Sequence, residues 1–229
     1  MIIGGLQKLT LIDYPGKLAA TVFFAGCNFR CPWCYSRELV LPEEIKKQPK
    51  VSEKEFFEFL KDRQELLEGI VICGGESTIN NNLPKFIKKI KKLRYAVKLD
   101  TNGSNPKMLK KLIKENLIDY VAMDVKLPKE RYSKILKAKV DDIEKSIKIL
   151  KENKIDYEFR TTVVPTILEK QDILKIAQWI SGAKKYYLQN FRPEKTLDPK
   201  FEKIKPYPDK YLLNIQKAIS PFFETCEIR

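Results

Sequence analysis

Three cysteines lie close together in the sequence, Cys27, Cys31 and Cys34, with the spacing C-x3-C-x2-C. Thiolates at this spacing can converge on one metal centre if the loop wraps around it, and the adjacent Gly26 and Pro32 suit such a loop. An iron–sulfur cube normally takes four cysteines. Because the chain contains 0 His, a three-cysteine cube would leave one iron without a protein ligand and open to another molecule.

Structural zinc is the alternative interpretation of the same cysteines, and it requires four ligands. The fourth ligand would have to be Cys73 or Cys226, each of which is distant in the sequence. We expect these two residues to be buried thiols instead. The lack of histidine also excludes Ser–His–Asp triads and Cys–His nucleophilic pairs. Chemistry must therefore come from cysteine, carboxylates, lysine, arginine, tyrosine or a bound cofactor.

The composition favours a globular protein in a reducing compartment. The 229 residues are 43% hydrophobic and 32% charged, which excludes a disordered tail protein. No apolar run approaches the ~20 residues of a membrane span, and residues 1–5 do not resemble the start of a signal peptide. The 5 Cys are an odd number, so a disulfide framework is not expected. We therefore expect a cytoplasmic protein with no membrane contact.

The formal net charge of +14 would suit an acidic partner or a nucleic acid. Lysines account for most of the excess, and they cover the polar faces of predicted helices such as 84–94, which favours solvated surfaces. Aromatic residues do not interleave with the basic runs, so nucleic-acid binding is not favoured. A zinc-stabilised nucleic-acid-binding protein is kept as the alternative from another class of function.

Hydrophobic runs alternate with amphipathic segments along the chain. The predicted strands are residues 18–25, 69–73, 95–101, 119–125, 157–164 and 185–189. The predicted helices are residues 52–67, 82–93, 106–116, 141–153, 169–181 and 208–222. A turn at 13–16 predicts a hairpin-like extension before the first strand.

This alternation predicts an α/β fold of parallel strands joined by right-handed crossovers. The strand–helix units are too few for a closed barrel of eight units. We expect an open partial (β/α)6 barrel in a single domain, residues 1–229, with the cysteines in a loop at 26–36 after the first predicted strand. A flat doubly wound sheet is the alternative.

Glycines and polar residues stand at the ends of the predicted strands, where parallel α/β folds bind their ligands. These residues are Gly74, Gly75, Glu76, Asp100, Thr101, Asn102, Gly103, Asp124, Lys126 and, within the fifth strand, Arg160. Paired glycines let a ligand approach the backbone, and a carboxylate beside them can accept hydrogen bonds from an ammonium group. Each residue alone also fits a turn or a structural ion pair. Together they predict one polar pocket beside the cysteine loop.

The cysteine loop reads Cys27-Asn28-Phe29-Arg30-Cys31-Pro32-Trp33-Cys34 and resembles the cluster motif of radical S-adenosylmethionine (SAM) enzymes. The preceding segment, Leu9-Thr10-Leu11-Ile12-Asp13-Tyr14-Pro15-Gly16-Lys17, resembles the activating enzymes of glycyl-radical enzymes. Among these, the chain is most similar to the anaerobic ribonucleoside-triphosphate reductase activating proteins. The partial barrel of that family agrees with the count of predicted strands.

The resemblance implies one 4Fe-4S cluster and S-adenosyl-L-methionine as cofactors. Cys27, Cys31 and Cys34 would hold three irons, and SAM would bind the fourth. The residues implied to contact SAM are Trp33, Cys34, Tyr35, Gly75, Glu76, Asp124, Val125, Lys126 and Arg160. In some relatives an Asp-Thr pair and a following aspartate bind a monovalent cation, and the matching residues here are Asp100, Thr101 and Asp124.

The resemblance also implies an oxidoreductase that works without oxygen. One electron from the cluster would cleave SAM to a 5′-deoxyadenosyl radical, which would abstract hydrogen from a glycine of a partner glycyl-radical enzyme. The alternative targets are a small molecule, such as a purine-like precursor, or tRNA. The positive net charge suits an acidic electron donor such as flavodoxin or ferredoxin.

Overall fold

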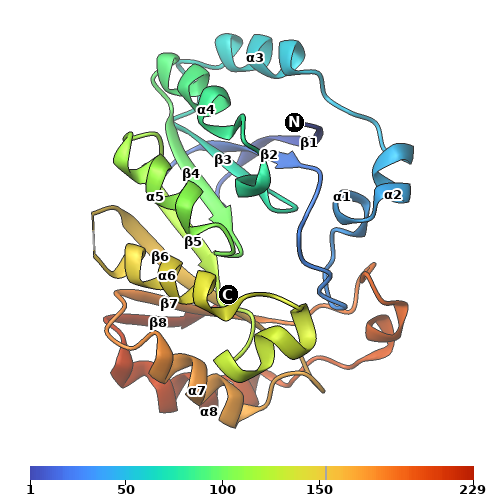
Figure 1. Cartoon of the computed structure of the whole chain (residues 1–229), viewed down its shortest axis with the longest axis vertical. Coiled ribbons are helices and arrows are strands. Elements are labelled where there is room, and N and C mark those ends of the chain that lie inside the picture. The colour runs from blue at the N-terminus through green and yellow to red at the C-terminus, as the bar shows by residue number, and fades with distance from the viewer. Residues whose placement is uncertain (153) are drawn as a thin grey trace. The chain divides into compact units, whose positions relative to one another are not determined.

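The computed structural model describes residues 1–152 and 154–229 (Figure 1). The described chain divides into two compact units, each built from several segments. The first unit comprises Met1–Asn28, Ser36–Thr101 and Lys107–Val121, and the second comprises Phe29–Tyr35, Asn102–Pro106 and Ala122–Arg229. The expected single domain stays a prediction.

The first unit is built on a sheet that begins with a hairpin. Strand β1 (Ile3–Thr10) pairs antiparallel with β2 (Ala19–Phe24). Strand β2 pairs parallel with β3 (Gly69–Gly74), and β3 pairs parallel with β4 (Ala96–Thr101). The predicted N-terminal hairpin and the first three predicted strands are therefore confirmed.

The first unit contains several helices and one short turn, and some of the helices bury apolar side chains beside this sheet. They are α1 (Arg37–Val40), α2 (Pro42–Lys47), α3 (Glu53–Asp62), the short turn η1 (Ser77–Ile79), α4 (Leu83–Lys92) and α5 (Pro106–Lys114), whose first residue belongs to the second unit. Phe86 of α4 packs edge-on against Phe24 of β2 with ring centroids 5.2 Å apart, and it stacks on Phe56 of α3 at 5.3 Å. Such aromatic pairs stabilise the fold beyond the contribution of the apolar area that they bury.

Helix α3 begins where the sequence predicts and ends early. Ser52 and Glu55 form the expected capping box, with hydrogen bonds of 3.1 and 2.7 Å between each side chain and the other's backbone N–H. The prediction extended this helix to residue 67, but it ends at Asp62. The backbone N–H of Leu67 instead donates to the Arg63 carbonyl, and this turn leads directly into β3.

The second unit holds the later strands and their helices. Strand β5 (Tyr120–Asp124) begins in the first unit and ends in the second. Strand β6 (Asp156–Val163) pairs parallel with β7 (Lys185–Asn190), and β7 pairs parallel with β8 (Thr225–Ile228). Its helices are α6 (Val140–Lys151), α7 (Lys170–Trp179), α8 (Asp209–Ile219) and the short turns η2 (Lys129–Arg131), η3 (Tyr132–Leu136), η4 (Pro199–Lys203) and η5 (Ser220–Phe222). The helices α7 and α8 lie side by side (Figure 1).

The strands are hydrogen-bonded in their order along the sequence, from β1 to β8. The alternation of strands and helices is confirmed, whereas β8 was not predicted. The last residue of the predicted helix 141–153 lies outside the described residues, and α6 ends at Lys151. Within the two described stretches, no helix is both long and apolar enough to cross a bilayer.

Candidate functional site

The turn after β3 brings two chain segments of the first unit into close contact. Gly74 has φ of +115°, a conformation that side chains disfavour, and a Cβ added to Gly75 would lie 2.1 Å from the carbonyl oxygen of Gly26. The N–H of Gly75 donates to the Phe24 carbonyl at 2.8 Å, and that of Glu76 donates to the Gly26 carbonyl at 2.8 Å. The predicted Gly-Gly-Glu turn is therefore packed against the residue that directly precedes the first cysteine.

The Glu76 carboxylate is almost fully buried, with 1% of the residue exposed. Its Oε1 accepts hydrogen bonds from the Thr101 hydroxyl at 2.8 Å, the Thr78 backbone N–H at 3.3 Å and the Thr78 hydroxyl. Burial of a carboxylate is costly unless such bonds replace water. The side chain that follows β3 is thus joined to Thr101, the last residue of β4, and both residues were predicted as site residues.

A buried ion pair occupies one face of β4. The Lys98 ammonium pairs with the Asp100 carboxylate, and only 1% of the lysine side chain and 12% of the aspartate side chain are exposed. Residues two apart in a strand share one face, so the pairing follows from the strand itself. The sequence prediction included Asp100 and missed Lys98. Lys98 could have been recognised as a candidate, because it is a lysine inside a predicted strand whose other residues are mostly apolar.

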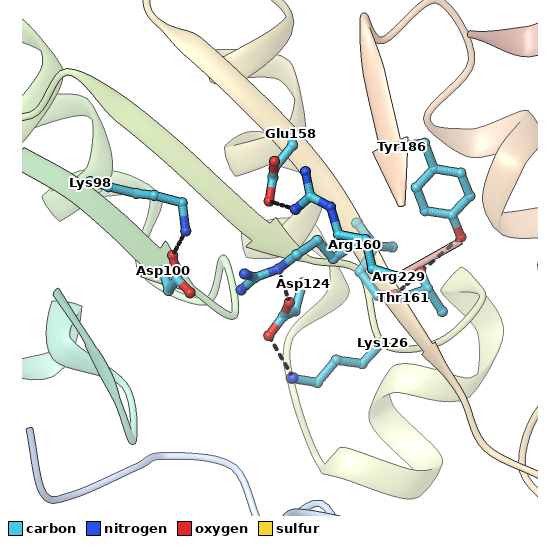
Figure 2. A network of polar contacts seen from close by, with 10 residues as sticks. Lys98, Asp100, Asp124, Lys126, Glu158, Arg160, Thr161, Tyr186 and Arg229 are labelled. Atoms are coloured by element: carbon cyan, nitrogen blue, oxygen red, sulfur yellow. Dashed lines mark hydrogen bonds and ion pairs between the residues drawn. The ribbon is translucent and has the colours of Figure 1, made fainter. Parts of the chain in front are cut away.

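In the second unit, Asp124 at the end of β5 binds two cationic side chains (Figure 2). Its Oδ1 accepts from Arg160 Nε at 3.0 Å, and its Oδ2 accepts from Lys126 Nζ at 3.1 Å. The carboxylate carries one negative charge and its partners carry two positive charges. These three predicted residues therefore form one ion-pair network, in which a single carboxylate binds two cations.

The surroundings of this site shift the pKa values of its groups. Burial opposes ionisation of Asp124, but the charges of Arg160 and Lys126 outweigh it and lower the pKa of Asp124 to about 2. Burial also opposes the charge of Lys126, yet the attraction of Asp124 and then of Cys31 and Cys34 raises the pKa of Lys126. Lys126 thus interacts electrostatically with two of the three cysteines of the motif.

Buried hydroxyl groups fix the backbone around these charges. The N–H of Val125 donates to the Arg160 carbonyl at 2.8 Å, and the Val125 carbonyl accepts from the Thr161 hydroxyl at 2.6 Å. The Tyr186 hydroxyl donates to Thr161 Oγ1 at 2.8 Å, and burial raises the pKa of Tyr186, which keeps it a donor. The Tyr132 hydroxyl accepts from the backbone N–H that follows Val125, at 2.8 Å. Sequence reasoning missed these three hydroxyl residues, because Thr161 and Tyr186 are ordinary strand residues and Tyr132 lies in the short turn η3.

Cys31 and Cys34 lie in the part of the cysteine loop that belongs to the second unit. The N–H of Cys34 donates to the Cys31 carbonyl at 3.0 Å, so the chain turns between them. The loop docks on a later segment, because Leu197 N–H donates to the Cys34 carbonyl at 2.8 Å and Asp198 N–H donates to the Pro32 carbonyl at 2.9 Å. These bonds hold two of the predicted ligands in a fixed backbone.

The aromatic residues that flank the last cysteine pack on the same later segment. Trp33 is buried against Phe201, with ring centroids 6.4 Å apart. Tyr35 stacks on Phe191 at 6.1 Å, and its hydroxyl accepts from the Arg192 N–H at 2.9 Å. Both rings therefore stabilise the cysteine loop, and their contact with an adenine stays a prediction.

Strand β8 is attached to β6 through a buried carboxylate that the sequence did not reveal (Figure 2). Glu158 has no exposed side-chain surface, and its Oε1 accepts from Arg229 Nη1 at 2.9 Å. The Arg229 guanidinium also lies 3.4 Å from the ring centre of Tyr187. Glu158 stands two residues before Arg160 on β6, so this pair supports the strand that carries a predicted site residue.

The donor set fits an iron–sulfur cluster. All five cysteines are in the reduced thiol form, and Cys27, in the first unit, is half-buried. Residues 1–152 and 154–229 contain no group of three His, Cys, Asp or Glu arranged around a single metal ion. A cube does not need such a group, because its thiolates bind different irons. Burial raises the pKa of Cys226 to about 11, so this thiol is protonated at neutral pH and is a poor ligand.

Comparison with protein families matches residues 21–180 to the Radical SAM superfamily. The chain is 33% identical to "Putative glycyl-radical enzyme activating enzyme MJ1227" of Methanocaldococcus jannaschii, over 100% of this chain and 95% of that protein. It is 27% identical to the pyruvate formate-lyase-activating enzyme of Clostridium pasteurianum, over 88% of this chain and 86% of that protein.

A solved structure shares the fold. The crystal structure of Streptococcus suis SuiB bound to S-adenosylmethionine aligns with a TM-score of 0.63 and 14% identity, over 90% of this chain and 51% of that chain. The predicted α/β class, with parallel strands in a partial (β/α)6 barrel, is confirmed by this likeness and by the strand order.

Proposed function

Because this chain belongs to the radical SAM superfamily, we propose that it activates a partner glycyl-radical enzyme. Its cofactors are one 4Fe-4S cluster and S-adenosyl-L-methionine. The observation that carries the proposal is the likeness, along the whole chain, to a protein named as a glycyl-radical enzyme activating enzyme. The proposed reaction class is that of an oxidoreductase.

Cys27, Cys31 and Cys34 would hold the cluster. The chemistry that the reduced cluster supplies is one electron for SAM, which breaks the bond from sulfur to the 5′ carbon and yields methionine and a 5′-deoxyadenosyl radical. The protein's task is to bind, orient and shield, and no acid–base residue is needed. This agrees with a chain of 0 His.

The two cations that flank Asp124 would bind the carboxylate of SAM. Lys126 and Arg160 donate charge-assisted hydrogen bonds to the Asp124 carboxylate, and ammonium and guanidinium groups bind a ligand carboxylate by the same kind of bond. Glu76 and the Gly75 backbone would receive the amino group of the methionine moiety, since a buried carboxylate favours an ammonium partner. Val125 would line the same site, held by its bonds to β6.

The radical would then abstract a hydrogen atom from a glycine Cα of the partner protein. We also propose an acidic electron donor, such as flavodoxin or ferredoxin, because the net charge of +14 would attract it. A cytoplasmic location is part of the proposal, and the five reduced cysteines agree with a reducing compartment.

The proposal predicts transfer of deuterium from the partner to 5′-deoxyadenosine. Anaerobically reconstituted protein, dithionite and SAM would be mixed with an anaerobic ribonucleotide reductase labelled with α-deuterated glycine. We expect deuterium in 5′-deoxyadenosine, read by mass spectrometry, together with a glycyl-radical signal in electron paramagnetic resonance (EPR).

A partner with alanine at the radical glycine is the matched control, and it should give no deuterium. If no glycyl-radical enzyme donates deuterium, and labelled tRNA or a labelled small molecule does, the protein-activating role is wrong while the radical chemistry stands.

A further inference from the structure

The ion pair on β4 bears on a question that the sequence raised, namely whether this protein binds a free monovalent cation. A carboxylate that is already paired with a cationic side chain attracts a free cation less strongly than an unpaired carboxylate does. The family resemblance implied cation ligands at Asp100, Thr101 and Asp124. The described side chains place each of these residues in other interactions.

Asp100 already has a cationic partner inside the first unit. The Lys98 ammonium pairs with it, and 99% of the lysine side chain is shielded from water, since 1% is exposed. A buried ammonium without its carboxylate would be strongly destabilised, and the same holds for the carboxylate. The pair is therefore a fixed part of β4, and a free cation would have to displace the Lys98 ammonium from Asp100.

The other two residues of the implied set also have partners within the chain. Thr101 is the neighbouring residue on the same strand, so its side chain leaves the opposite face, and its hydroxyl donates to Glu76 Oε1 at 2.8 Å. Asp124, in the second unit, binds the cations of Lys126 and Arg160 at 3.1 and 3.0 Å. Each carboxylate thus has its positive charge supplied by the chain.

We propose that the Lys98 ammonium takes the place of a free monovalent cation beside Asp100, so that this protein works without Na⁺ or K⁺. The lysine supplies the same charge as such an ion. Because its ammonium group is covalently attached to the chain, this charge is present whichever salt is used. The inference extends the proposed function, because the charge at Asp100 lies at the end of β4, among the strand ends that would bind SAM.

The first test needs no substrate. The thermal unfolding midpoint of the cluster-loaded protein would be measured anaerobically in K⁺, Na⁺ or tetramethylammonium at one ionic strength. We expect the same midpoint in all three salts for the wild type. For Lys98→Met, which shortens the side chain by one atom and removes its charge, we expect a lower midpoint that K⁺ or Na⁺ restores in part.

Lys89→Met is the matched control, because Lys89 forms an exposed pair with Glu53 at 2.6 Å. It should show no selective response to K⁺ or Na⁺. A saturable, cation-specific rise of the wild-type midpoint would overturn the proposal even if Lys98→Met does not fold. A folded Lys98→Met that ignores K⁺ and Na⁺ would overturn it as well.

The second test is the affinity for SAM, measured by equilibrium binding in the same salts. We expect less than about twofold variation for the wild type, and for Lys98→Met a loss of at least about tenfold that K⁺ or Na⁺ reverses, within the usual range of coupling between sites. If the wild type binds no SAM in any salt, the proposed function fails. The unfolding midpoints would still decide whether Lys98 replaces a cation.

Discussion

Replacement of Cys31 by alanine is expected to lower the formation of 5′-deoxyadenosine by at least about a hundredfold. Loss of even an outer-shell partner of a metal site costs about 10–100-fold in affinity or activity, and a direct ligand should cost more. Cys31 is buried, its carbonyl accepts from Cys34 N–H at 3.0 Å, and its attraction contributes to the raised pKa of Lys126. With no histidine in the sequence, no imidazole can substitute for the missing thiolate.

The product would be measured by chromatography after anaerobic reconstitution, with dithionite and SAM present. Cys226→Ala is the matched control, because this thiol lies on β8 and its pKa of about 11 keeps it protonated. The control should retain iron and activity. Wild-type yields of 5′-deoxyadenosine from Cys31→Ala would refute the assignment of the cysteine loop as the cluster site.

Replacement of Asp124 by asparagine is expected to weaken SAM binding by at least about tenfold and to destabilise the second unit. The two cations would then repel each other without the carboxylate between them. Breaking a fully buried pair costs about 3–5 kcal/mol. Because 30% of the Asp124 side chain is exposed, we expect about 1–3 kcal/mol in the free energy of unfolding.

The stability difference between wild type and Asp124→Asn should depend on pH. The pKa of Asp124 is lowered to about 2, below the ordinary aspartate value of about 3.9. Its contribution to stability is therefore fully present above pH ~4 and is lost as the pH falls through about 2. Denaturant unfolding across this range would measure the difference. Asp156→Asn, an exposed residue on β6, should show no such dependence, and a constant difference for Asp124→Asn would contradict the ion-pair account.

The elements that carry the site were predictable because their signals are local. Apolar runs bounded by turn residues revealed the strands from β2 to β7, and the Ser52–Glu55 capping box revealed the start of α3. Strand β8 was missed because it has only four residues and is mostly half-buried, so its pattern is weak. Helices α1 and α2, of four and six residues, are too short to show a helical period.

The partners within the site could not be predicted, because they depend on contacts between distant residues. Glu158 and Arg229 are 71 positions apart, and the Tyr35 hydroxyl accepts from a backbone N–H 157 positions away. The cysteine motif needs no such contact, since its spacing lies within one loop. Lys98 shows the limit most clearly, because its burial beside Asp100 follows from the fold and the local sequence does not reveal this ion pair.

The measurement that tests the central claim most directly is EPR of the anaerobically reconstituted, dithionite-reduced protein before and after addition of SAM. We predict the signal of a reduced 4Fe-4S cluster whose g-values change when SAM binds, because three cysteines leave one iron open. A signal that saturating SAM leaves unchanged, or a protein that takes up no iron, would contradict the account.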